Sequence, residues 1–155
     1  MISPNQRAID ERYMEQALVL ANQAFDSGEV PVGAIVVLGD NVLGTGCNRC
    51  VNDHDPSAHA EVIALRRAAL NRKNFRLDGA TLYVTLEPCL MCCGAVLQSR
   101  VARIVYGARE PRTGAVVSVH DAFRLPQIDH HVAITEGVCA EESASLLKAF
   151  FERLR

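Results

Sequence analysis

The residues best suited to do chemistry are three cysteines in one short segment, TLEPCLMCCG at residues 85–94. Pro88 suits the first position of a helix, so Cys89 and Cys92, three residues apart, are predicted to share one face near a helix start. Free backbone N–H groups at such a start favour negative charge and hence thiolates. Two thiolates suit a zinc ion. We expect Cys93 to be a small buried apolar side chain instead.

The remaining ligands of such a site must come from elsewhere, and two segments offer them. In CNRC, Cys47 and Cys50 would complete a closed four-cysteine site, as in a zinc-stabilised binding module. In SAHAEV, His59 would supply one nitrogen and leave a position open to water, as in a hydrolytic enzyme. The 38 residues between Cys50 and Cys89 exceed the roughly 15–20 typical of four-cysteine ribbons, which favours His59.

Glu61, next but one to His59, strengthens the hydrolytic interpretation. On an ideal helix two such positions lie about 200° apart. Side chains in the first turn lean toward the helix N-terminus, however, so a substrate that approaches end-on meets both. The histidine would hold the metal, and the carboxylate would handle the protons of its water. Two helix starts, at Pro56 and Pro88, are then expected to meet at one zinc ion.

Helices and strands alternate along the chain, which predicts an α/β fold with a mixed sheet between helical layers. Asp55 is expected to cap the second helix. Residues 109–130 are expected to form loops with one short helix. The predicted helices span 10–26, 56–72, 88–99 and 141–154; the predicted strands are a hairpin around Gly39-Asp40-Asn41, then 80–85, 102–108 and 131–138.

Length and composition are those of a single globular domain, residues 1–155. No apolar run reaches the roughly 20 residues of a membrane span, and the polar N-terminus lacks a signal core, so we expect a cytoplasmic protein without a membrane partner. The six cysteines are then expected to be reduced, metal-bound or buried. Residues 1–61 carry a net charge of −6 and residues 62–112 a net charge of +6. The basic segment indicates phosphate binding or a solvated helix face.

His59-Ala60-Glu61 followed by Pro88-Cys89-Leu90-Met91-Cys92 matches the zinc deaminase pattern H-x-E…P-C-x-x-C. Beyond these motifs, the chain resembles bacterial tRNA-specific adenosine deaminases, of the cytidine deaminase-like zinc deaminase superfamily, over nearly its whole length. The stretches that carry the resemblance are GEVPVGAIVV, GCNRCVNDHDPSAHAE, ATLYVTLEPCLMCCGA, RIVYGAREPRTGA, ITEGV and LLKAFFERLR.

The resemblance implies a three-layer α/β/α cytidine deaminase-like fold with a central mixed five-stranded sheet. It implies one Zn²⁺ per subunit, held by His59, Cys89 and Cys92, with Glu61 as the catalytic proton carrier. The implied reaction is hydrolytic deamination of adenosine to inosine at the wobble position of a tRNA anticodon. The implied partners are a tRNA anticodon stem-loop and a second copy of the chain in a homodimer.

The resemblance also implies a set of substrate-binding residues, among them an asparagine that binds the purine edge and an apolar wall against a flipped-out base. These residues are Val30, Pro31, Asn48, Ala60, Arg109, Glu110 and Phe151. Of Phe150 and Phe151, at least one is expected to pack in the core. The chain departs from the family's usual pattern at Glu110-Pro111 and at Cys47.

Two other functions compete with this interpretation. One is a deaminase of free bases or nucleosides, such as guanine or cytosine. The other is a non-catalytic zinc-stabilised RNA-binding protein.

Overall fold

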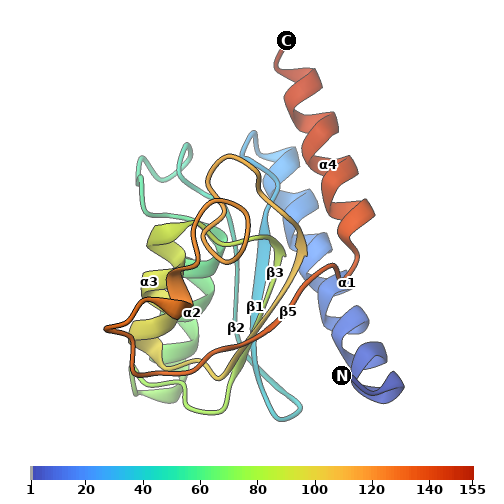
Figure 1. Ribbon diagram of the computed structural model, residues 1–155. Helices are drawn as coiled ribbons and strands as arrows, with labels where there is room; N and C mark the ends of the chain where they lie inside the picture. The colour runs from blue at the N-terminus through green and yellow to red at the C-terminus, as the bar shows by residue number, and fades with distance from the viewer. Residues whose placement is uncertain (1) are drawn as a thin grey trace.

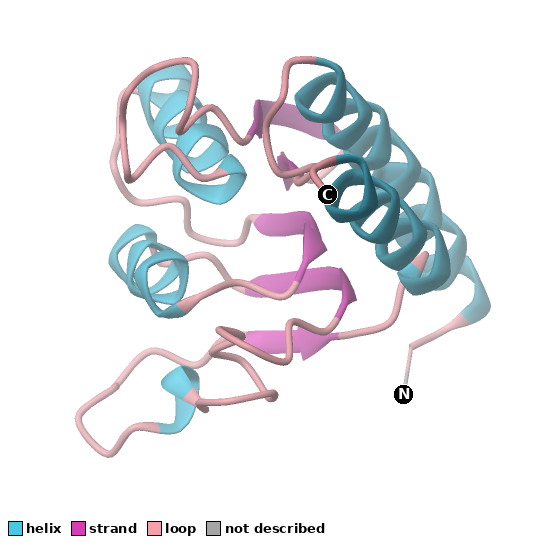
Figure 2. Cartoon of the chain, turned by 90° about the horizontal axis from the view of Figure 1, so that it is seen from above, coloured by secondary structure: helices cyan, strands magenta, loops and turns pink. Residues whose placement is uncertain are grey.

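The computed structural model describes residues 2–155, in which a five-stranded sheet lies between two pairs of helices. Helices α2 and α3 cover one face, and α1 and α4 cover the other (Figure 1, Figure 2). The elements are α1 (Pro4–Asp26), β1 (Gly33–Leu38), β2 (Asn41–Cys47), α2 (Ala60–Arg72), β3 (Thr81–Leu86), α3 (Leu90–Ser99), β4 (Arg103–Ala108), a 3-10 turn (Ala122–Arg124), β5 (Ala133–Thr135) and α4 (Ala140–Arg153). None of these helices is long and apolar enough to cross a bilayer.

The strand order is β2-β1-β3-β4-β5. Strand β1 runs antiparallel to both β2 and β3, whereas β3, β4 and β5 are parallel to one another. The predicted mixed sheet between helical layers is therefore confirmed, although the last strand is only three residues long and not eight. Parallel neighbours need a crossover, and α3 provides the one from β3 to β4.

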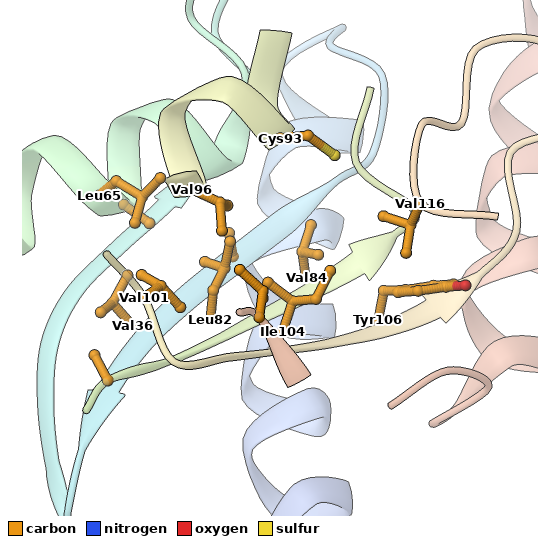
Figure 3. Packing of buried hydrophobic residues seen from close by; sticks show 14 of the residues in the cluster. Val36, Leu65, Leu82, Val84, Cys93, Val96, Val101, Ile104, Tyr106 and Val116 are labelled. Carbon is orange, nitrogen blue, oxygen red and sulfur yellow. The ribbon is translucent and has the colours of Figure 1, made fainter. Parts of the chain in front are cut away.

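Alternate residues of the central strands point to opposite faces, and both faces are buried. Ile35 and Val37 of β1 pack toward α1, while Ala34 and Val36 pack toward α2 and α3. Burial on both faces explains why β1, β3 and β4 read as continuous apolar runs. The larger core contains Val36, Leu65, Leu82, Val84, Cys93, Val96, Val101, Ile104, Tyr106 and Val116 (Figure 3).

Two glycines of β2 let α2 lie unusually close to the sheet. A Cβ at Gly46 would stand 2.7 Å from the carbonyl oxygen of Ala60, and one at Gly44 would stand 2.4 Å from that of Ala64. Any larger residue at either position would push the helix away. The glycines therefore fix the first turn of α2 against β2.

Two predicted helix starts are wrong, and the error matters for the site. Asp55 does not cap α2, because its Oδ1 accepts hydrogen bonds from the Ser57 N–H and hydroxyl and closes a turn. The helix begins four residues later than predicted, at Ala60, with His59 as its N-cap. Likewise Pro88 precedes the N-cap of α3, which is Cys89.

The first helix also begins earlier than predicted, at Pro4 and not at residue 10. The Ser3 hydroxyl accepts a hydrogen bond from the N–H of Gln6, and Pro4 occupies the first helical position. Serine followed by proline is a typical helix start. The apolar periodicity, which begins only near Tyr13, does not reveal this polar first turn.

Candidate active site

His59 and Cys89 occupy equivalent positions at the starts of α2 and α3. Both are N-cap residues with extended backbone, and neither side chain makes a capping hydrogen bond. The side chains turn toward each other instead, with His59 Nδ1 lying 3.6 Å from Cys89 Sγ and 3.5 Å from Cys92 Sγ. The ligand atoms of all three residues lie within 4.8 Å of one another, so they form a group that could hold a metal ion.

The two sulfurs titrate as a coupled pair. The hydrogen bond from Cys92 is the main cause that lowers the pKa of Cys89 to about 4, and the contact with His59 lowers it further. The same bond, together with burial, raises the pKa of Cys92. The bond to Cys89 also raises the pKa of His59. The contacts within the cluster thus favour the thiolate form of Cys89, which is the form that binds zinc.

The other cysteines lie outside this group. Cys93, a residue of α3, is fully buried in the core, and burial raises the pKa of its thiol to about 12. Cys47 and Cys50 are half-buried, and within residues 2–155 neither belongs to a group of metal-binding geometry. The closed four-cysteine arrangement left open by the sequence is therefore not what the chain forms.

Glu61 is the second residue of α2 and is only 4% exposed. It lines the same cavity as His59 and Cys89, because the first turn of α2 opens onto the cavity end-on, as expected from the sequence. Burial raises the pKa of the Glu61 carboxyl. A carboxyl group with a raised pKa, beside a candidate metal site, is suited to accept and donate protons near neutral pH.

The cavity has a volume of about 320 Å³. Four of the residues implied as substrate-binding line it: Val30, Asn48, Glu110 and Phe151. Its remaining lining residues are Glu29, Val32, Cys50, Val51, His59, Glu61, Leu86, Glu87, Cys89 and Thr113. The lining contains four carboxylates and no lysine or arginine, so the cavity favours an uncharged or cationic group over a phosphate.

Asn48 links the cavity to the start of α2. Its Oδ1 accepts a hydrogen bond of 2.8 Å from the N–H of Ala60, the first helical residue. The asparagine thus does the capping that the His59 side chain does not do. Since Oδ1 is occupied in this way, the Nδ2 group is the part of the amide that remains to donate to a ligand.

Three residues implied as substrate-binding do not line the cavity. Pro31 and Ala60 are buried beside it, and Ala60 acts through its bond to Asn48. Arg109 is exposed and forms an ion pair with Glu136, with Nη2 and Oε1 2.9 Å apart. Of the two phenylalanines of α4, Phe151 lines the cavity. Its neighbour Phe150 is buried and packs edge-to-face on Phe25 and Phe151, as expected for one of the two.

The sequence did not single out Glu29 and Glu87, two buried carboxylates that line the cavity. Glu29 accepts hydrogen bonds from the N–H groups of Val51 and Asn52 and from the Asn52 side chain. Glu87 likewise accepts hydrogen bonds from backbone N–H groups of the segment from Glu110 to Ser118. The available signal was an acidic residue inside the otherwise apolar stretches GEVPVGAIVV and TLYVTLEP.

Comparisons with known proteins place the chain among deaminases. The MafB19-like deaminase family matches residues 9–155. A tRNA-specific adenosine deaminase of Haemophilus influenzae is 48% identical over 147 residues, which cover 94% of this chain and 85% of that protein. One of Buchnera aphidicola subsp. Schizaphis graminum is 52% identical over 154 residues, covering 94% of this chain and 96% of that protein.

A solved structure from a study of A-to-I editing by tRNA:A34 deaminases at the wobble position of transfer RNA is also similar. It superimposes with a TM-score of 0.85 at 41% identity, over 87% of this chain and 98% of that one. The cytidine deaminase-like three-layer fold implied by the resemblance is thereby confirmed. The protein belongs to the MafB19-like deaminases and, among them, to the family of tRNA-specific adenosine deaminases.

Proposed function

We propose that the protein converts adenosine to inosine, with release of ammonia, at the wobble position of a tRNA anticodon. The observation that carries the proposal is the position of Glu61, buried in the wall of a base-sized cavity beside a cluster of one imidazole and two thiols. Such a constellation fits hydrolytic deamination better than RNA binding, since a binding site needs no buried carboxyl group beside a metal.

The metal in this proposal is one Zn²⁺ per chain, held by His59, Cys89 and Cys92. In a tetrahedral site with bonds of about 2.0 Å to nitrogen and 2.3 Å to sulfur, the nitrogen and sulfur atoms stand about 3.6 Å apart. The two nitrogen–sulfur distances are 3.6 and 3.5 Å, so the donor atoms fit this ion. When bound, zinc with three protein ligands supplies a water molecule whose pKa is lowered toward neutrality.

Glu61 is the proton carrier in the proposed reaction. Its carboxylate accepts a proton from the attacking water, delivers it to N1 of the purine and later helps to protonate the departing ammonia. Burial raises its pKa, so the carboxyl holds a proton more readily than an exposed glutamate does. Glu61 follows His59 by two residues in the first turn of α2, so the helix keeps its carboxyl close to the histidine.

The other cavity residues select an uncharged base. Asn48 presents its Nδ2 group to an acceptor on the purine, because Oδ1 is bonded to Ala60. Val30 and Phe151 give apolar surface for the faces of the ring. Because the lining lacks cations, the phosphates flanking the base lie outside the cavity in this proposal, and the exposed Arg112, next to the lining residue Thr113, can bind one of them.

We further propose that the protein works in the cytoplasm as a homodimer. Support for a second copy comes from Leu90 and Met91, consecutive residues at the start of α3, which are 57% and 40% exposed. Exposed apolar side chains that adjoin one another typically mark an interface. Light scattering of the purified protein is expected to give the mass of two chains, and a mass of one chain would contradict the dimer.

The deciding experiment measures inosine and ammonia on an anticodon stem-loop with adenosine at the wobble position. Free adenosine, cytosine and guanine are offered in parallel, with a stem-loop that carries adenosine only outside the anticodon as the control. We expect inosine only at the wobble position, loss of activity after chelation and recovery with zinc. Turnover of the free compounds alone would overturn the proposal, and activity that survives complete metal removal would overturn the role of zinc.

A further inference from the structure

The segment from Glu110 to Ser118 forms one wall of the cavity, which Glu110 and Thr113 line. The segment lies outside the five strands of the sheet. Its middle is tied to the start of α3 by the bridge between Gly114 and Cys89 and by the Ala115 N–H, which bonds the Pro88 carbonyl at 2.9 Å. The bonds to the N–H groups at its two ends come from a side chain instead.

The carboxylate of Glu87 accepts hydrogen bonds from both ends of the segment. Oε1 accepts from the Glu110 N–H at 3.0 Å and from the Ser118 hydroxyl. Oε2 accepts from the N–H groups of Val116 (3.1 Å), Val117 (2.9 Å) and Ser118 (3.0 Å). A single side chain thus closes residues 110–118 into a loop around itself.

The fit around this carboxylate is tight. Glu87 is 2% exposed, and a Cβ at Gly114 would stand 2.4 Å from its Cδ atom. No ion pair among residues 2–155 includes Glu87. A buried carboxylate is costly unless donors surround it, and here the donors belong to the wall. The arrangement of the segment in the structure brings five donors to the charge.

We propose that Glu87 is a positioning residue for substrate, which acts through segment 110–118 and holds the wall against which the base binds. This inference rests on the proposed deaminase function. Glu87 touches neither the reacting atoms nor the metal, so loosening the wall weakens ground state and transition state alike. The loss therefore falls on KM and leaves kcat nearly unchanged.

The test is Glu87→Gln, assayed on the anticodon stem-loop. An amide keeps the size of the side chain but turns an NH₂ group toward backbone N–H donors. We expect KM to rise about tenfold, the equivalent of losing one charged hydrogen bond, with kcat within about threefold of wild type and one metal per chain. Loss of metal, a fall in kcat at unchanged KM, or no change in either constant would overturn the proposal.

Ser118→Ala provides a milder variant that remains informative even where Glu87→Gln does not fold. It removes one donor from the loop side and leaves the four backbone bonds, so KM is expected to rise about two- to threefold. Ser99→Ala is the matched control, since it removes a hydroxyl bond to the Val96 carbonyl in the last turn of α3, the opposite end from Cys89. Equal effects of the two serine variants on KM would overturn the proposal.

Amide hydrogen exchange separates this inference from the proposed reaction, because it needs no turnover. The amides of Val116, Val117 and Ser118 are expected to exchange at least about tenfold faster in Glu87→Gln. The amide of Cys93, which bonds the Cys89 carbonyl in the first turn of α3, is expected to keep its rate. Unchanged exchange at residues 116–118 would contradict the proposal that Glu87 holds this wall. A wild-type protein that is inactive on every substrate would contradict only the proposed function.

Discussion

The cavity has two kinds of wall, and they are held by different means. The wall that carries the cluster consists of the first turns of α2 and α3, which regular packing fixes against the sheet. The facing walls are irregular segments, 48–55 and 110–118, which two buried carboxylates, Glu29 and Glu87, hold through long-range hydrogen bonds.

The difference indicates that the two kinds of wall have different functions. Atoms that must hold a metal and move a proton need positions accurate to a fraction of an ångström, which helix starts on a packed sheet provide. A wall that must admit and release a base works better as a loop. Changes on the helix side are therefore expected to remove metal or lower kcat, and changes on the loop side to raise KM.

The largest effect is expected from replacing Cys92, one of two adjacent cysteines of α3. Cys92→Ala removes a donor of the cluster, so we expect loss of bound metal and of activity, as measured by elemental analysis and inosine formation. Cys93→Ala is the matched control, because its sulfur packs in the core. It is expected to keep one metal per chain and to lower the free energy of unfolding by about 1 kcal/mol. The reverse pattern would reassign the ligand.

Next in size is Glu61→Gln, which preserves shape but cannot carry a proton. We expect kcat to fall by about 10²–10⁴-fold while metal content and KM stay close to wild type. Stopped assays on the stem-loop, with elemental analysis of the same preparation, measure all three quantities. Unchanged kcat would remove Glu61 from the mechanism.

A third test breaks the packing that fixes the helix side. Gly46→Ala would place a Cβ 2.7 Å from the Ala60 carbonyl, so it is expected to lower the free energy of unfolding by about 1–3 kcal/mol and to weaken metal binding. The control is Gly94→Ala in α3, where a Cβ meets nothing within 4 Å. That change is expected to stabilise the helix by about 0.5–1 kcal/mol. Denaturant unfolding compares the two, and equal effects would contradict close packing at β2.

The same division explains how much the sequence predicts. The spacing of Cys89 and Cys92, and of His59 and Glu61, is local, so the reactive side of the cavity follows from it. The partners of Glu29 lie 22 and 23 residues away and are mostly backbone amides, which no side-chain pattern reveals. The predicted start of α2 failed for a related reason, because an aspartate that closes a turn looks in sequence like one that caps a helix.

The smallest expected effect tests the second loop. Glu29→Gln removes the charged acceptor of three bonds from Val51 and Asn52, so the segment that carries Asn48 is expected to loosen. We expect KM to rise about three- to fivefold with kcat retained, less than for Glu87→Gln, because the Glu87 carboxylate accepts five bonds and that of Glu29 three. Asn52→Ala, which removes the side-chain bonds alone, should fall between this variant and wild type. A change in kcat at constant KM would contradict the division of the walls.

The pH dependence of stability tests whether the charge of Glu29 holds its loop. Burial alone would raise the pKa of Glu29, but the bonds from Asn52 and Val51 outweigh it and hold the pKa below its ordinary value of 4.5. A lowered pKa in the folded state means that the contribution to stability is complete above 4.5 and is lost as the pH falls through the lowered value. Since Glu29→Gln lacks this titration, its unfolding free energy should approach that of the wild type only as the pH falls below 4.5 and through the lowered pKa. A difference that stays constant down to acid pH would show that the carboxylate does not hold the loop by its charge.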